Sequence, residues 1–396
     1  MQSLLNIKTP YYLYDTDLLH SNLSFVSSIA GSFGFHIHYA LKANNNPGIT
    51  QIISRYGLGA DCVSGYEISE ALYRNFPAKK IVYAGVGKTD DEIRLALQNN
   101  ILCLNCESIE ELQVIEQIAS SMQKTAPVAI RVNPDIEPYT HKYITTGKEE
   151  NKFGLHLNHL KQALEFINNS TSLKFMGLHF HIGSQITTIE PFAKLCKKVN
   201  SIWRIFELDS YGGCLLNLGG GLGIDYSSED NAANPGFKEY FSLFHNKLDI
   251  PSHVNIHFEL GRSIVASCGK LITRVLYTKE GISKNFVIVD AGMTELMRPA
   301  LYNAQHRIEN LTSPGMQAIY DVAGPICESS DVFAKNIKLP KTARGDLLAI
   351  HSCGAYGESM MLSYNMRPKV KSWFVSNGVI ARGQSGVESE PERVFA

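Results

Sequence analysis

Apolar stretches of strand length recur eight times between residues 35 and 261, and this repeat constrains the fold more than any other feature. The runs are FHIHYAL, GADCVS, IVYAG, ILCLN, VAIRVN, MGLHFHIGS, LLNLGGG and VNIHFELG. Most are separated by helical periodicity: TDDEIRLALQNN opens with a capping Thr89, and the spacing of Ser108 and Glu111 in SIEELQVIEQIASSM predicts a capping box. Eight strand-helix alternations over about 240 residues predict an α/β fold with a (β/α)8 TIM-like barrel, whose usual size is about 250 residues.

The pattern changes near residue 270. Beyond it, KLITRVLYTK, NFVIVDAG, AIYDVAGP, GDLLAIHSCG and KVKSWFVSNGVIA are strand-like, with turn residues rather than helical periodicity between them. A chain of 396 residues, 44% of them apolar, is large enough for two cores. We therefore expect a barrel over residues 22–270 and a β-sandwich-like domain made of residues 1–21 and 271–396, to which TPYYLYD adds a strand.

Charge and cysteine usage narrow the classes of partner and compartment. Lys and Arg number 37 against 38 Asp and Glu, without a long basic run, so nucleic acid and anionic membranes are not expected partners. The start MQSLLNIKTPYYLYDTD lacks the apolar core of a signal peptide, and no apolar stretch reaches membrane-spanning length, which predicts a cytoplasmic protein. Eight scattered cysteines indicate reduced thiols, and the pair Cys103 and Cys106 has no second pair to complete a zinc site.

Polar residues that interrupt the apolar runs gather where the barrel strands should end, which is where barrel enzymes place their chemistry. Lys42 ends the first run, and Asp61 and Ser64 lie in the second. HFHIGSQ closes the sixth run, GGGLG the seventh and FELGR the eighth. Loops after the seventh and eighth strands commonly bind phosphate in this fold, so the glycine triplet predicts a phosphorylated ligand.

A phosphate site that faces a lysine across a barrel mouth is the minimum needed to hold pyridoxal phosphate. Lys42 would form the Schiff base, Glu259 would keep the ring nitrogen protonated, and His181 would stack on the ring. Each residue could also have a purely structural role. Lys42 could be a solvated surface lysine, Glu259 could form an ion pair with Arg262, and His181 could be a hydrogen-bonded core histidine.

Several motifs in fixed order give the chain a resemblance to a known family. YALKAN, GADCVSGYE, HFHIGSQ, GGGLGIDY, DAGMTELMRPALY, GPICESSD and GAYGESM…SYNMRP cover nearly its whole length. By these motifs it resembles the diaminopimelate decarboxylases, pyridoxal phosphate enzymes of the alanine-racemase-like fold (fold type III). The resemblance implies decarboxylation of meso-2,6-diaminopimelate to L-lysine and CO2, the last step of lysine biosynthesis.

The resemblance also implies roles for individual residues, with no metal site. The cofactor would be held by Lys42, His181, Ser184, Gly219, Gly220, Gly221, Glu259, Gly261, Arg262 and Tyr364. The substrate would be bound by Arg262, Arg298, Tyr302, Glu328 and Tyr364. The catalytic residues would be Lys42 and Cys327, the latter as proton donor. In the family the cysteine and the following glutamate reach a neighbouring subunit's cofactor, which implies a head-to-tail homodimer with shared sites.

Three positions depart from the family pattern. Leu260 stands where E-P-G-R has proline, Tyr66 where glycine is common, and Cys353 where alanine is common. Tyr66 is expected to narrow the pocket near the second strand, which would affect the choice of substrate.

Other functions remain open. The pairs His36 with His38 and His179 with His181 suggest a metal-dependent barrel hydrolase, although the first pair lies before the end of its strand. A catalytically silent binding protein is disfavoured because Lys42 is kept together with the thiol of the CES motif. Within the fold, a decarboxylase of ornithine, arginine or carboxynorspermidine is the nearer competitor.

Overall fold

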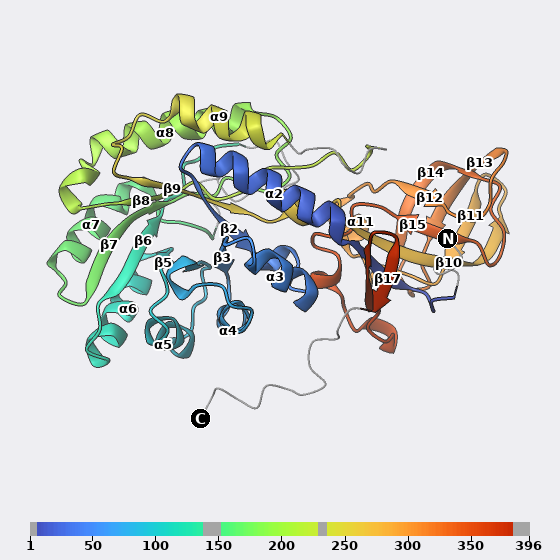
Figure 1. The fold of residues 1–396 in the computed structure, drawn as a ribbon, viewed down its shortest axis with the longest axis horizontal. Coiled ribbons are helices and arrows are strands. Elements are labelled where there is room, and N and C mark those ends of the chain that lie inside the picture. Colours follow the sequence, from blue (N-terminus) through green and yellow to red (C-terminus); the bar gives the residue numbers. More distant parts are fainter. Residues whose placement is uncertain (1–5, 138–151, 229–235, 383–396) are drawn as a thin grey trace.

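The computed structural model describes residues 6–137, 152–228 and 236–382. Figure 1 shows two parts side by side: a barrel surrounded by helices, and a β domain that holds the N-terminal strand and most of the chain after residue 270. Among the described residues, no helix is both long and apolar enough to cross a membrane.

The eight expected barrel strands are confirmed. They pair in parallel and in sequence order, and the barrel closes where the first strand pairs with the last. The strands are β2 (His36–Ala40), β3 (Gly59–Cys62), β4 (Ile81–Tyr83), β5 (Cys103–Cys106), β6 (Ala126–Arg131), β7 (Leu173–His179), β8 (Leu215–Asn217) and β9 (Asn255–Leu260).

Helices alternate with these strands and cover the outside of the barrel (Figure 1). They are α2 (Thr16–Ser32), α3 (Pro47–Ser54), α4 (Gly65–Tyr73), α5 (Asp90–Gln98), α6 (Ile109–Ser121), α7 (Leu160–Asn169), α8 (Glu190–Ile205), α9 (Phe237–Lys247) and the short α10 (Arg262–Val265). Thr89 caps α5 as expected, and Ser108 caps α6. The second hydrogen bond of the predicted capping box, from the N–H of Ser108 to Glu111, is replaced. The Glu111 carboxylate instead accepts from the N–H of Glu107, one residue before the cap, at 2.6 Å.

Among the described residues, the β domain contains nine strands in one connected sheet. They are β1 (Tyr11–Asp15), β10 (Gly269–Glu280), β11 (Asn285–Val289), β12 (Ile308–Asn310), β13 (Gln317–Ala323), β14 (Val332–Pro340), β15 (Leu347–Ile350), β16 (Lys371–Ser376) and β17 (Val379–Arg382). The expected N-terminal strand is confirmed: β1 pairs antiparallel with β10 and parallel with β16. One further helix, α11 (Arg298–Tyr302), lies between β11 and β12.

Strand β1 joins the two parts because both of its faces are buried. Tyr12 and Tyr14 belong to the large core that includes the barrel, whereas Tyr11 and Leu13 belong to a smaller cluster with β10 and β15. The hydroxyl of Tyr12 donates to the carbonyl of Glu295 at 2.6 Å. The alternation of one strand therefore ties the β domain to the barrel mouth.

Candidate active site

Lys42 lies in a single 3-10 turn, Leu41–Ala43, that follows β2, so the prediction that it ends the strand is wrong by two residues. The β domain holds this turn. Ser359 Oγ donates to the carbonyl of Lys42 at 3.0 Å, and the N–H of Tyr356 donates to the carbonyl of Ala43 at 2.7 Å. Contacts between the two domains, rather than the alternation of β2, therefore set the direction of the lysine side chain.

The Lys42 amine contacts a buried carboxylate. Its Nζ lies 2.7 Å from Oδ2 of Asp61 at the end of β3, whose side chain is fully buried while that of Lys42 is 34% exposed. Burial, the largest single effect, acts to lower the pKa of Lys42, but the nearby Asp61, Tyr356 and Glu259 together raise that pKa overall. Burial, and then the charge of Glu259, raise the pKa of Asp61, which Lys42 opposes. Oδ1 of Asp61 is buried without a hydrogen-bond partner.

Glu259 is held at the end of β9 by three neutral or basic side chains. Its Oε1 accepts from Asn217 at 2.7 Å and from Asn105 at 3.4 Å, and its Oε2 lies 3.2 Å from Nε2 of His179. Burial acts to raise the pKa of Glu259, but His179 and the charge of Lys42 lower it overall, so the carboxylate is ionised. Its partner is therefore His179, and the alternative ion pair with Arg262 does not form.

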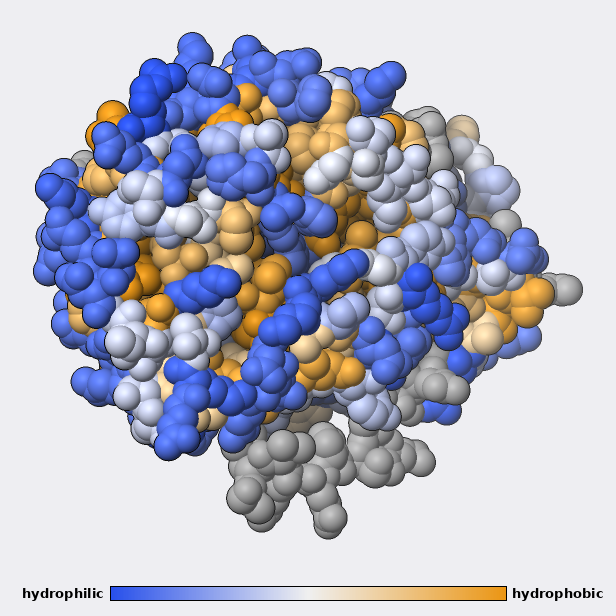
Figure 2. Space-filling view, turned by 60° about the vertical axis from the view of Figure 1, so that its left-hand side comes forward, coloured by the Kyte–Doolittle hydropathy of each residue, from blue (hydrophilic) through white to orange (hydrophobic). Residues whose placement is uncertain are grey.

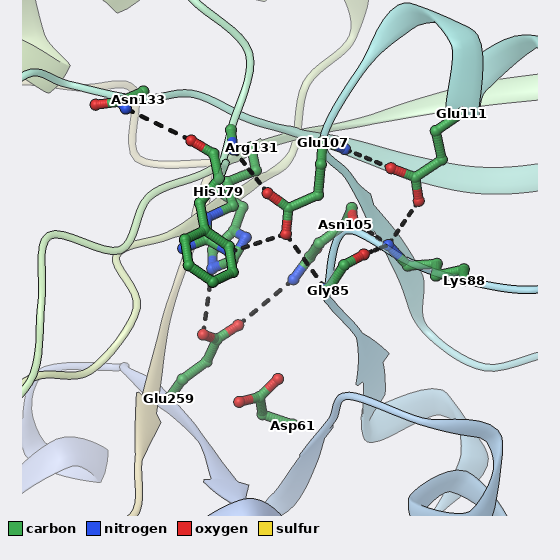
Figure 3. A network of polar contacts seen from close by, with 12 residues as sticks. Asp61, Gly85, Lys88, Asn105, Glu107, Glu111, Arg131, Asn133, His179 and Glu259 are labelled. Atoms are coloured by element: carbon green, nitrogen blue, oxygen red, sulfur yellow. Dashed lines mark hydrogen bonds and ion pairs between the residues drawn. The ribbon is translucent and has the colours of Figure 1, made fainter. Parts of the chain in front are cut away.

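A layer of buried charges supports the residues around Glu259 (Figure 3). Lys88 has no exposed side-chain surface and pairs with Glu111 at 2.6 Å, while it also donates to the backbone carbonyl of Asn105 at 2.8 Å. Beside it, Glu107 pairs with Arg131 at 2.8 Å. These contacts fix the backbone of β5 and of the residue after it, and through Asn105 they fix the position of Glu259.

The glycine triplet lets the end of β8 lie against its two neighbouring strands. A Cβ on Gly219 would collide with the carbonyl of Phe180, and one on Gly220 would collide with the carbonyl of Glu259. The N–H of Gly220 donates to Nδ1 of His181 at 3.3 Å. Burial lowers the pKa of His181 well below its ordinary value, so this ring is neutral and can accept that bond.

Two buried arginines, Arg262 at the start of α10 and Arg298 at the start of α11, both contact Tyr226. Arg262 donates to Ser184 Oγ at 2.9 Å and to the hydroxyl of Tyr226 at 2.6 Å. Arg298 donates to Nε2 of His306 at 2.8 Å and stacks on the ring of Tyr226 at 4.3 Å. Within the part of the chain that the structure describes, neither guanidinium pairs with a carboxylate, and the Nε of each is buried without a partner. Buried charges of this kind call for an anionic ligand.

A cavity of about 200 Å³ at the C-terminal end of the barrel brings Lys42, Glu259 and Arg262 together, whereas Arg298 does not line it. It is lined by Ala40, Lys42, His181, Ser184, Gly221, Leu222, Glu259, Leu260, Gly261, Arg262, Ser263, Tyr302 and Tyr356. An amine, an ionised carboxylate, a neutral imidazole and a guanidinium thus share one small space. This set fits a phosphorylated pyridine aldehyde: the amine can bond to the aldehyde, the carboxylate can face the ring nitrogen, and Ser184 with Arg262 can hold the phosphate.

Comparison with known proteins agrees with this geometry. Residues 24–266 match the family model described as the pyridoxal binding domain of pyridoxal-dependent decarboxylases. The diaminopimelate decarboxylase of Bacteroides thetaiotaomicron is 48% identical over 368 residues, which covers 93% of this chain and 95% of the relative. That of Helicobacter pylori strain J99 is 43% identical, covering 92% of this chain and 89% of the relative.

The chain belongs to the diaminopimelate decarboxylase family. It is thus a carboxy-lyase dependent on pyridoxal phosphate. Among solved structures, Helicobacter pylori diaminopimelate decarboxylase in complex with L-lysine matches with a TM-score of 0.90 at 40% identity, covering 96% of this chain and 95% of that one. Diaminopimelate decarboxylase from m. jannaschii, also in complex with L-lysine, matches with a TM-score of 0.88 at 36% identity, covering 96% of this chain and 90% of that one.

Three residues expected at the family's site lie elsewhere within the single chain. Cys327 is exposed, and its N–H donates to Asn365 Oδ1 at 3.1 Å. Glu328 accepts from the hydroxyl of Tyr364 at 2.7 Å. Tyr302 lines the cavity of the same chain. The expected site residues that do not line it are Cys327, Glu328, Tyr364, Arg298, Gly219 and Gly220.

The histidines that suggested a hydrolase do not meet. His38 and His257 are joined at 2.7 Å and, with His36, line a separate cavity of about 450 Å³ at the N-terminal end of the barrel. Among the described residues no group of three or more His, Cys, Asp or Glu is arranged to hold a metal ion.

The surface of the barrel side is mostly hydrophilic. Figure 2 shows this side turned forward, with apolar side chains in hollows between the hydrophilic ones.

The departures from the family pattern have different surroundings. Leu260 ends β9, is buried and lines the cavity. Tyr66 is 74% exposed and does not line the cavity, so the expectation that it narrows this pocket is wrong for the single chain. Cys353 is buried, and its thiol donates to the carbonyl of Ile350 at 3.2 Å.

Several residues of the site had not been assigned from the sequence. They are Asn105, His179, Asn217, Tyr226, His306 and Tyr356. Asn105 and Asn217 carried a usable signal, because each is an asparagine inside an otherwise apolar run of a barrel strand, where a buried amide needs a polar partner. Tyr226 and His306 carried none, since both lie in loops.

Proposed function

We propose that this chain converts meso-2,6-diaminopimelate to L-lysine and CO2. The observation that carries the proposal is a pair of buried guanidiniums that no described carboxylate neutralises. Arg262 lines the cavity with a lysine and an ionised glutamate, and Arg298 stacks on Tyr226, to which Arg262 donates. Diaminopimelate has an amino acid group at each end. One guanidinium suits the cofactor phosphate and the other suits the carboxylate of the end that does not react.

The residues of the cavity divide the work around the cofactor. When bound, pyridoxal phosphate withdraws the electron pair that the departing CO2 leaves behind. Glu259, an ionised carboxylate, would hold a proton on the ring nitrogen of the cofactor. Lys42 would hold the cofactor through its amine, and Asp61, 2.7 Å away, would orient the Lys42 amine by its charge. His181 would cover one face of the ring, and the phosphate would be bound by Ser184, the glycine triplet, Gly261 and Arg262.

A second subunit completes the site in this proposal. Cys327 would donate a proton to the carbon that lost CO2, Glu328 would bind the distant ammonium, and Tyr364 would contact phosphate and substrate. All three belong to a cluster outside the cavity of their own chain, on exposed segments of the β domain. We therefore propose a head-to-tail homodimer in which the barrel of residues 22–270 receives these side chains from the partner's β domain, residues 1–21 and 271–396. A cytoplasmic location also stays a prediction.

The direct test is release of CO2 by the purified protein with pyridoxal phosphate. Diaminopimelate, ornithine and arginine should be supplied separately, with Lys42→Ala as the inactive control. We expect turnover of diaminopimelate alone, because ornithine and arginine lack the second carboxylate. Comparable kcat/KM for ornithine or arginine would overturn the substrate assignment and favour the competing decarboxylases of the same fold.

A further inference from the structure

The side chain of His306 contacts the guanidinium of Arg298 in the β domain. The histidine follows α11, precedes β12 and is 6% exposed. Its Nδ1 lies 2.8 Å from the carbonyl oxygen of His351, and its Nε2 lies 2.8 Å from a terminal nitrogen of Arg298. Both ring nitrogens are therefore engaged.

These two contacts determine the protonation state of the ring. A carbonyl oxygen only accepts hydrogen bonds, so Nδ1 of His306 carries the hydrogen. A guanidinium only donates, so Nε2 carries the lone pair. His306 is then neutral, and burial together with the charge of Arg298 lowers its pKa to about 3 in agreement with this geometry.

The choice of a neutral acceptor has a consequence for Arg298. Buried arginines are usually paired with carboxylates, which cancel their charge. Here the ring of Tyr226 and the imidazole of His306 hold the guanidinium without cancelling it. Tyr226 also accepts from Arg262 at 2.6 Å, so one tyrosine spaces the two cations. The cluster keeps its attraction for an anion because every contact that orients it is neutral.

We propose that His306 is a positioning residue for specificity: it aims the Arg298 guanidinium, with its charge uncompensated, at the carboxylate of the end of the substrate that does not react. The inference rests on the proposed function, because it presumes such a carboxylate. Tyr226 serves the same arrangement as the surface on which the guanidinium stacks. Neither residue touches the reacting carbon in this proposal.

Three substitutions at one position separate orientation from charge. His306→Gln can place an amide oxygen near the site of Nε2 and keep a neutral acceptor, His306→Leu removes the acceptor, and His306→Glu keeps an acceptor but adds a negative charge. His351→Gln is the matched control, because this is another buried histidine of the β domain whose side chain contacts Arg307 and Glu309 instead.

The first measurements are KM and kcat for diaminopimelate. The affinity of the holoenzyme for L-lysine is measured by calorimetry, independently of turnover. Cofactor content and melting temperature are recorded for every variant. His306→Leu should raise KM and weaken lysine binding by about ten- to hundredfold, the scale of a lost hydrogen bond to a charged group, with a smaller change in kcat. His306→Gln should restore most of both. His306→Glu should bind lysine as poorly as His306→Leu, because the new carboxylate neutralises Arg298.

Each outcome decides between the explanations. Lysine affinity that is unchanged in His306→Leu, or equal in the Glu and Gln variants, overturns the positioning role. If the leucine variant does not fold, the comparison of the Glu and Gln variants still decides. Wild-type protein that neither decarboxylates diaminopimelate nor binds lysine contradicts the proposed function itself, which is a separate result from failure of the His306 variants alone.

Discussion

The contact between Lys42 and Asp61 predicts how the free protein acquires its cofactor. The lysine amine must lose its proton before it can bond to an aldehyde, and the carboxylate 2.7 Å away favours the protonated form. Asp61→Asn removes this charge while keeping the size of the side chain. An opposite charge at this distance shifts a pKa by about 1–3 units, so the pKa of Lys42 should fall by about that much in the variant.

The loss of unfolding free energy in Asp61→Asn should lie below the usual range for a broken buried ion pair. Breaking a buried ion pair costs about 3–5 kcal/mol, because an uncompensated charge stays behind. Here the charge that stays belongs to Lys42, whose side chain is 34% exposed and can be hydrated, whereas the fully buried partner becomes a neutral amide. We therefore expect a loss of about 1–3 kcal/mol in the apo-protein, after allowing for screening by water.

The assay is the rate at which apo-protein takes up pyridoxal phosphate covalently, followed over pH and trapped with borohydride. In the wild type the rate should keep rising with pH across the accessible range, because the pKa of Lys42 is raised. In Asp61→Asn the rate should level off at a lower pH. Asp321→Asn, which breaks an ion pair with Lys284 in the β domain, should leave the profile unchanged. Identical profiles for wild type and Asp61→Asn would refute the role of the carboxylate, and trapping at another lysine would refute the site.

Three further predictions concern the loop, the dimer and acid stability. Gly220→Ala should lower the melting temperature and weaken cofactor binding, since its Cβ would meet the Glu259 carbonyl, whereas Gly31→Ala, with open space around it, should be neutral or slightly stabilising in thermal melts. Lys42→Ala and Cys327→Ala chains should each be nearly inactive alone but recover about a quarter of wild-type activity when co-expressed. About half of the dimers should be heterodimers, and each heterodimer should contain one intact site and one defective site. No recovery in verified heterodimers would show that each site is built within one chain. Burial lowers the pKa of His38 to about 4, so between about pH 6.5 and pH 4 the unfolded chain binds one proton more than the folded chain. The free energy of unfolding should therefore fall by about 1.4 kcal/mol per pH unit from this group as the pH drops through that range. His38→Gln should flatten that slope in denaturant titrations, and an unchanged slope would contradict a neutral buried His38.

Local pattern in the sequence was enough for the architecture. Each barrel strand is a short apolar run next to a helical period, and such periods depend only on neighbouring residues. The strands missed were β12, which has three residues, and β14, in which VFAKNIKLP alternates around lysine and asparagine at the end of the sheet and is half exposed. Their pairing partners, rather than their own apolar content, make them strands.

The ordered motifs also carried the family and, with it, the cofactor and the identity of Lys42 and Glu259 as candidates. Tertiary structure alone decided how those side chains are held. Lys42 takes its direction from Ser359 and Tyr356, more than 300 residues further along the chain, as the separations of 317 and 313 positions show. A period of two or 3.6 residues contains no information about such contacts.

The anion site shows the same division most clearly. Tyr226, Arg262 and the pair Arg298 and His306 come from three separate segments, and the sequence around each does not reveal these contacts. Whether a buried guanidinium attracts an anion depends on whether a carboxylate or a neutral acceptor packs against it, and the electrostatic energy depends on distances in space. The sequence by itself therefore determined which kinds of residue are present and in which fold, and only the folded chain decided which charges remain uncompensated.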